Sequence, residues 1–265
     1  MTDLHVTRWG QTGPRVVLVH GSAQGGRVGG DSHFARQQRL GSQGWQLLVP
    51  DRPGHGQSLD PRRPDDAQAD GALVAELLGE SAHLVGHSFG ACVALAAATL
   101  RPSSVRSLTL IEPAMALLAM NKPSVLKFGL TAAMIAMAPL SDIWRIKRFM
   151  QLVKIPPELR GTEGVDDDGL KRLGRAIARL RVPDKKTLLG QLKELKAAGV
   201  PLLVVAGSWS PAFRAISDSV AEVASGKTLV ISCEHHFPHL VSEQFNEALV
   251  TFMGACDQRR EQRSV

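Results

Sequence analysis

The sequence predicts an α/β fold in which helices flank a mostly parallel central sheet. The first observation is that short runs rich in β-branched residues alternate with helical segments. The second is that several of these runs end in Gly, Pro or polar turns. A third observation concerns residues 114–198, which have almost no strand character. We therefore expect a core formed by residues 1–113 and 199–265, interrupted by a helical cap at residues 114–198.

The expected elements follow one another in a strand-turn-helix order. The predicted strands are residues 15–20, 45–50, 81–86, 105–111, 201–207 and 227–232. The predicted helices of the core include residues 69–78, 89–100 and 242–253, the last opening with a capping-type Ser-Glu-Gln. We expect the polar tail from Asp257 onward to fray.

The predicted cap has an unusual composition. It holds five of the seven methionines (Met115, Met120, Met134, Met137 and Met150). Residues 142–196 carry 14 Lys or Arg against 8 Asp or Glu, an excess equal to the +6 of the whole chain. Leu117, Leu118, Met134 and Met137 are candidates to roof an apolar substrate pocket, or else they form the core of the cap. The basic excess fits either an anionic partner or a solvated helical face, and the methionine-rich surface is a candidate homodimer contact.

Composition excludes several classes of protein. With 44% hydrophobic and 21% charged residues among 265, the chain is an ordinary globular one rather than disordered. No apolar run reaches the ~18 residues of a membrane span, and the first residues do not resemble a secretory signal. Three cysteines favour reduced thiols in the cytoplasm. No zinc-finger spacing or RNA-binding aromatic pattern supports nucleic-acid binding.

The strongest chemical signal is Gly86-His87-Ser88-Phe89-Gly90, a G-x-S-x-G pattern between a predicted strand and a predicted helix. A turn this tight requires small residues two positions before and after the serine. Gly86 and Gly90 meet that demand, and the turn would raise the Ser88 hydroxyl above the sheet edge. Ser88 is therefore the predicted nucleophile.

A serine hydroxyl needs a base and a site for the oxyanion. The histidines His235, His236 and His239 follow the last predicted strand, and chemistry alone leaves the base open among them. The backbone N–H groups of Ser22 and Phe89 are the predicted oxyanion donors. Pro238 disfavours a helical metal site between His235 and His239, and the glycine-rich residues 24–30 lack a phosphate-loop ending, so we expect no metal and no cofactor.

Four segments in order make the chain resemble the α/β-hydrolase superfamily over almost its whole length. They are His20-Gly21, the run Asp51-Arg52-Pro53-Gly54-His55-Gly56-Gln57-Ser58, the motif around Ser88, and His236-Phe237-Pro238-His239. The resemblance implies an α/β-hydrolase fold with a cap, and it implies that His236 is the base.

The third catalytic residue departs from the commonest pattern of these enzymes. Many relatives carry an Asp just after the penultimate strand, where this chain has Gly207-Ser208-Trp209-Ser210-Pro211. Some, including haloalkane dehalogenases and zearalenone-type lactonases, place the acid after the strand that follows the nucleophile helix. Glu112 occupies that place, and Asp218 is the alternative.

With Ser88 at the elbow, the resemblance implies acyl transfer: cleavage of an ester, lactone or thioester of a mainly apolar small molecule through an acyl-enzyme, by Ser88, His236 and Glu112. Two alternatives stay open. One is a lyase, a C–C hydrolase, or a cofactor-free haloperoxidase-like or dioxygenase-like member of the same fold. The other is a catalytically silent small-molecule binding protein.

Overall fold

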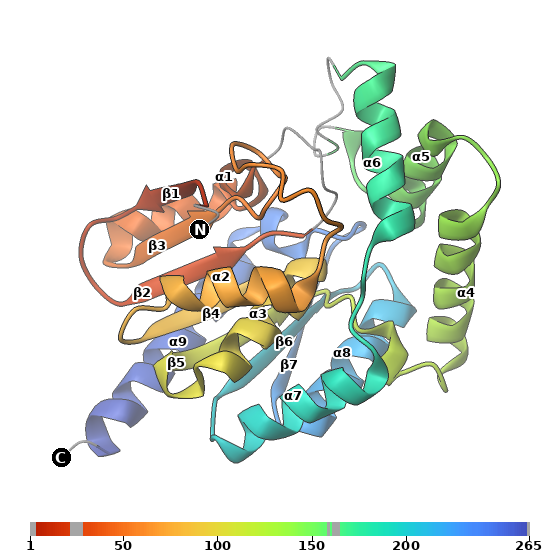
Figure 1. Ribbon diagram of the computed structural model, residues 1–265. Helices are drawn as coiled ribbons and strands as arrows, with labels where there is room; N and C mark the ends of the chain where they lie inside the picture. The colour runs from red at the N-terminus through yellow and green to blue at the C-terminus, as the bar shows by residue number, and fades with distance from the viewer. Residues whose placement is uncertain (1–3, 22–28, 158–159, 161–164, 264–265) are drawn as a thin grey trace.

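The computed structural model describes residues 4–21, 29–157, 160 and 165–263. Its centre is a seven-stranded sheet of order β1-β3-β2-β4-β5-β6-β7 (Figure 1). The strands are β1 (Val6–Trp9), β2 (Arg15–Val19), β3 (Gln46–Pro50), β4 (Ala82–His87), β5 (Val105–Ile111), β6 (Leu202–Gly207) and β7 (Lys227–Ile231). Only β1 is antiparallel to its neighbour, so the predicted mostly parallel sheet is confirmed.

Helices cover both faces of this sheet, which is why nearly every residue of the central strands is buried. One face packs against α2 (Ala67–Leu77), α3 (Phe89–Leu100), α7 (Lys185–Ala197) and α8 (Pro211–Ala224). The other packs against α9 (Glu243–Arg263) and the 3₁₀ turns at Ala35–Gln43, which follow the short α1 (Gly30–His33). Figure 1 shows the sheet between these two layers.

Three helices between β5 and α7 stand apart from the sheet: α4 (Pro123–Met137), α5 (Asp142–Leu152) and α6 (Asp167–Arg179) (Figure 1). The helices α5 and α6 share a small core of their own, made of Ile146, Met150, Leu173 and Ile177. The helix α7 also lies in the predicted cap segment, yet its buried leucines join the main core. On α4, Met134 and Met137 are 62% and 76% exposed, so these two side chains face solvent.

Two sequence-based expectations were incomplete or wrong. The edge strand β1 was not predicted. The predicted frayed tail is wrong, because α9 continues as far as Arg263. Asp257 explains the extension, since its carboxylate is bound by Arg106 Nη1 at 2.9 Å and by His83 Nε2 at 3.2 Å. These contacts tie the last turns of α9 to β4 and β5.

Two further observations concern membrane-spanning helices and the cysteines. Within the described ranges, no helix has both the length and the apolar character needed to cross a bilayer. Cys92, Cys233 and Cys256 are buried free thiols.

Candidate active site

The sharp turn between β4 and α3 holds Ser88 in a conformation that few side chains adopt. Its φ is 56°, and its N–H donates to the Ile111 carbonyl at 2.9 Å. A Cβ on Gly86 would lie 2.4 Å from the Gly90 carbonyl oxygen, and one on Gly90 would lie 2.3 Å from the His20 oxygen. The predicted need for glycine at both positions is confirmed. Ser88 itself is half-buried.

The loop after β7 brings an imidazole to this serine. His236 Nε2 lies 2.9 Å from Ser88 Oγ, and His236 Nδ1 lies 2.9 Å from Glu112 Oε2. The ring is 4% exposed and packs against Phe213, with ring centroids 4.6 Å apart. Of the three histidines in this loop, His236 is the one that the structure places between the serine and a carboxylate.

Glu112 directly follows β5 and is fully buried. Its Oε1 accepts from the Gly207 N–H at 2.5 Å, and its Oε2 accepts from Trp209 Nε1 at 3.0 Å as well as contacting His236. Two N–H donors besides the imidazole thus hold this carboxylate. Asp218, the alternative acid, lies exposed on α8, so the structure brings Glu112 to His236 instead.

Burial shifts the titration of both partners. Desolvation lowers the pKa of His236 to about 3, with repulsion from His235 as the smaller cause, so the imidazole is neutral and can accept a proton. Desolvation raises the pKa of Glu112 to about 8, while the donors Gly207 and Trp209 act in the opposite direction because they favour the charged carboxylate.

Of the two predicted oxyanion donors, Phe89 lies within the described residues and Ser22 does not. As the first residue of α3, Phe89 has a backbone N–H without an intrahelical acceptor, at the positive end of the helix dipole. Ser22 lies outside the described residues. Its neighbour Gly21 is described, and a Cβ there would lie 3.1 Å from Ser88 Cβ, so this backbone lies beside the serine.

Arg52 fixes the position of the Gly21 backbone. The guanidinium donates to the carbonyls of His20 and Gly21, each at 3.1 Å. Asp65 and Asp70 hold the same guanidinium from the other side, at 2.7 and 2.8 Å. Because all three charged groups are fully buried, this network is a rigid support for the segment beside Ser88.

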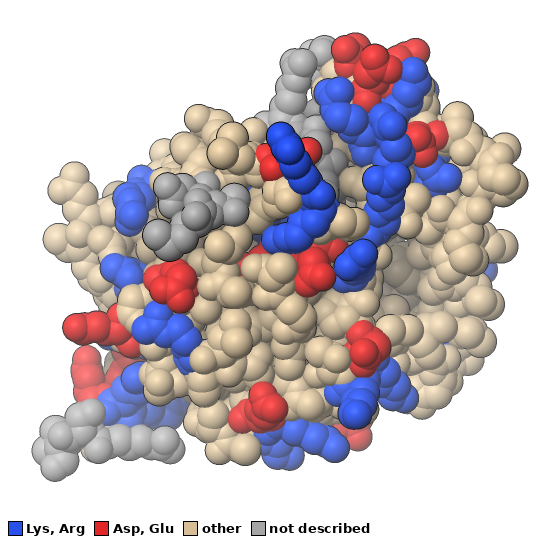
Figure 2. All heavy atoms as spheres, in the orientation of Figure 1, with Lys and Arg blue, Asp and Glu red and all other residues tan. Residues whose placement is uncertain are grey.

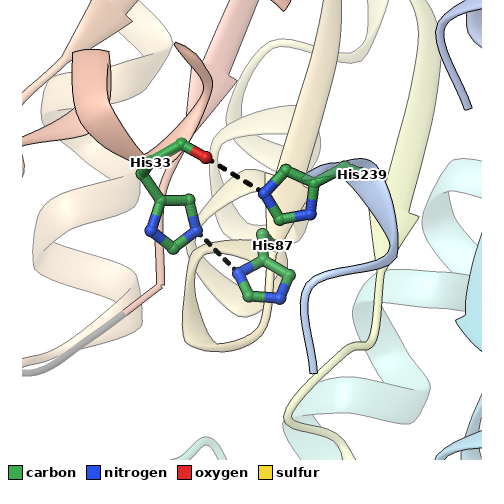
Figure 3. A group of neighbouring side chains, drawn as sticks. All are labelled: His33, His87 and His239. Atoms are coloured by element: carbon green, nitrogen blue, oxygen red, sulfur yellow. Dashed lines mark hydrogen bonds between the residues drawn. The ribbon is translucent and has the colours of Figure 1, made fainter. Parts of the chain in front are cut away.

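A second group of imidazoles, His33, His87 and His239, lies behind the base (Figure 3). One ring nitrogen from each lies within 4.8 Å of the others, a spacing that a metal ion could in principle bridge. His87 Nε2 must donate to the His236 carbonyl at 2.7 Å, because a carbonyl only accepts. His87 Nδ1 therefore accepts from His33 Nε2 at 2.7 Å, and His239 Nε2 donates to the His33 carbonyl at 3.1 Å. These hydrogen bonds engage His33 Nε2, both ring nitrogens of His87 and His239 Nε2, and the one from His87 holds the His236 backbone. His239 Nδ1 is buried and has no hydrogen-bond partner among the described residues.

Sequence reasoning missed two residues of this site. Trp209 donates to the carboxylate, and His87 holds the base loop. Trp209 could have been found, because it follows β6 in the stretch where related enzymes place an acid. The contact of His87 joins residues 149 positions apart, and no local pattern could indicate it.

Comparison with known proteins gives the family. The sequence profile described as "Alpha/beta hydrolase family" matches residues 16–248. The chain belongs to the alpha/beta hydrolase family. Its fold is correspondingly similar to that of the esterase EaEST from Exiguobacterium antarcticum, with a TM-score of 0.70, 20% identity and 95% of each chain covered.

Two other proteins are similar to the chain in sequence. The chain is 37% identical over 122 residues to lipase LipV of Mycobacterium tuberculosis, covering 43% of each protein. It is 30% identical over 276 residues to the dihydrolipoyllysine-residue acetyltransferase component of the acetoin cleaving system of Pseudomonas putida, covering 93% of this chain and 66% of that one. This alpha/beta hydrolase therefore spans less than two thirds of the length of either relative.

Proposed function

We propose that the protein is a cytoplasmic serine hydrolase that cleaves an ester, lactone or thioester of a mainly apolar small molecule. The observation that carries the proposal is the line of contacts from Ser88 through His236 to Glu112, with two distances of 2.9 Å. This order of hydroxyl, imidazole and buried carboxylate is the arrangement that activates a serine for acyl transfer.

In the proposed reaction, His236 Nε2 removes the proton from Ser88 as Oγ attacks the substrate carbonyl. Glu112 accepts from Nδ1–H, which keeps Nε2 free to act as the base and stabilises the imidazolium that forms. The N–H groups of Phe89 and Ser22 would hold the oxyanion, and His236 then protonates the leaving group. A water molecule attacks the acyl-enzyme in the same way and regenerates Ser88.

Covalent labelling tests the nucleophile. A fluorophosphonate probe should label the wild-type protein at Ser88, and Ser88→Ala should lose the label together with about ten thousandfold or more of its activity on p-nitrophenyl esters. Ser32→Ala, an exposed serine outside the site, is the matched control and should keep both. Labelling that persists in Ser88→Ala would show that another residue reacts with the probe and would contradict the assignment of Ser88. Turnover of substrate without an acyl-enzyme would favour a lyase-type or dioxygenase-like member of the fold.

The substrate class has its own test. The apolar composition of the cap supports a substrate with a sizeable apolar part, so kcat/KM should rise with acyl length along a series of p-nitrophenyl esters. A preference for acetate with no gain for longer chains would contradict this part of the proposal.

Size-exclusion chromatography with light scattering, on wild type and Met137→Glu, tests whether the exposed apolar face of α4 joins two copies.

A further inference from the structure

A groove of about 680 Å³ runs between α6 of the cap and the loop that precedes α2 in the core. Gly54, Ser58 and Pro64 belong to its core wall. Its charged lining residues are five arginines and a single aspartate: Arg62, Arg63, Arg172, Arg175, Arg179 and Asp60. So many guanidinium groups around one concave space create a strongly positive potential there.

The arginines come from two opposing walls. Arg172, Arg175 and Arg179 stand three and four positions apart on α6, so they share one face of that helix. Arg62 and Arg63 come from the core loop, where Arg62 adopts a positive φ of 55°. Figure 2 shows Lys and Arg side chains running along α6 and facing others across from it.

Little acidic charge compensates this lining. Arg63 is bound to Asp70 at 2.5 Å, and Arg175 lies 3.6 Å from Asp142. Arg62, Arg172 and Arg179 form no salt bridge with any residue in the described ranges. The hydrogen bond and positive charge of Lys171 are the main causes that lower the pKa of the nearby Asp168, and Arg172 is a smaller one. The lining therefore keeps guanidinium groups available for an outside anion.

The two walls are tied together at one end of the groove. The Arg181 N–H donates to the Asp65 carbonyl at 3.2 Å, and Arg181 forms a β-bridge with Asp66. This contact lies two residues beyond Arg179 and two beyond Arg63. Because the walls are joined there, the like charges of the two sides stay near one another, and an anion that bridges them would relieve their repulsion.

We propose that this groove binds a small molecule that carries two or more phosphate groups. Guanidinium forks match phosphate oxygens in a bidentate way, and several of them together favour an anion with more than one phosphate over a single carboxylate. The arginines line a concave groove instead of a convex face, which favours an enclosed small ligand over an acidic protein surface. This site is separate from the proposed hydrolytic one and does not depend on it.

Calorimetric titration of the full-length Ser88→Ala protein with sodium tripolyphosphate tests the site without any turnover. We expect one site per chain, with affinity decreasing from tripolyphosphate to pyrophosphate to phosphate, and with weaker binding as salt rises from about 0.05 M to about 0.3 M. The double variant Arg172→Gln/Arg179→Gln should bind about a hundredfold more weakly, because each of the two charge-assisted contacts is worth roughly one power of ten.

A matched double variant, Arg8→Gln/Arg214→Gln, removes the same charge from exposed arginines outside the groove and should bind as the parent does. Arg62→Gln, a variant on the core wall of the groove, should independently weaken the binding of tripolyphosphate. The proposal is overturned if tripolyphosphate does not bind, if both double variants weaken it equally, or if hexaglutamate peptide binds as tightly as tripolyphosphate. Since every arm lacks the Ser88 hydroxyl, these results are independent of whether the protein is a hydrolase.

Discussion

The buried arginine of the core and the arginines of the cap show two opposite uses of the same side chain. Arg52 is fully buried, and two aspartates and two carbonyl oxygens occupy its guanidinium. Arg172 and Arg179 on α6 are exposed and form no salt bridge with the described residues. The difference indicates that charge in the core fixes geometry beside Ser88, whereas charge on the cap is available for a ligand.

Among the charged residues of the core and the cap, the largest effect is expected from replacing the buried carboxylate that contacts His236. Glu112→Gln should lower kcat/KM by about 10³- to 10⁴-fold, because an amide neither stabilises the imidazolium nor selects its tautomer. Steady-state kinetics on an activated ester measures this. Asp218→Asn is the matched control and should keep full activity, since Asp218 is exposed on α8. Loss of activity in Asp218→Asn alone would show that the acid has been misassigned.

Unfolding experiments test directly whether the core arginine and the cap arginines differ in their contribution to stability. Arg52→Gln should reduce the free energy of unfolding by about 3–5 kcal/mol, because it leaves the buried Asp65 and Asp70 without their shared partner. Arg179→Gln should leave the urea midpoint unchanged, because exposed side chains contribute little to stability. Equal midpoints for the two variants would refute the distinction drawn between core and cap.

The dependence of kcat/KM on pH tests the role proposed for the buried carboxylate of Glu112. In the proposed mechanism the carboxylate form of Glu112 is the active one. Because burial raises its pKa to about 8, kcat/KM should rise with pH and level off above about 8. The pKa of His236 is lowered to about 3, so this imidazole stays neutral between pH 6 and 9 and causes no second change in kcat/KM there. Glu112→Gln should lack the rise. A wild-type profile that is flat from pH 6 to 9 would contradict the assignment.

A smaller effect is expected from Trp209→Phe, which removes one donor from Glu112 Oε2 while keeping an aromatic ring. Losing a hydrogen bond to a charged group costs roughly tenfold in kcat/KM. The same loss disfavours the carboxylate, so the acid limb of the pH profile should move to higher pH. A drop in activity without that displacement would assign Trp209 a purely structural role.

The sequence alone predicted the parts of this molecule that have local signatures. The six strands β2 to β7 and the glycines around Ser88 carry such signatures, as does the order of the motifs. The edge strand β1 was missed because four residues are too few to show an alternating pattern. The extension of α9 depends on Asp257 meeting Arg106 from a distant strand, and local polarity indicated the reverse.

The same limit applies to the candidate site. The position of Ser88 could be predicted because its turn imposes steric demands on nearby residues. The choice between Glu112 and Asp218 could not be settled from sequence, because it depends on which carboxylate the fold buries beside His236.

The link from His87 to the His236 carbonyl has a mechanical consequence. The residue that anchors the loop of the proton acceptor is the immediate neighbour of the hydroxyl that it serves, so the two reacting groups share one attachment at the end of β4. The hydrogen bond that makes this attachment joins β4 to the loop after β7, so it involves none of the helices α4, α5 and α6.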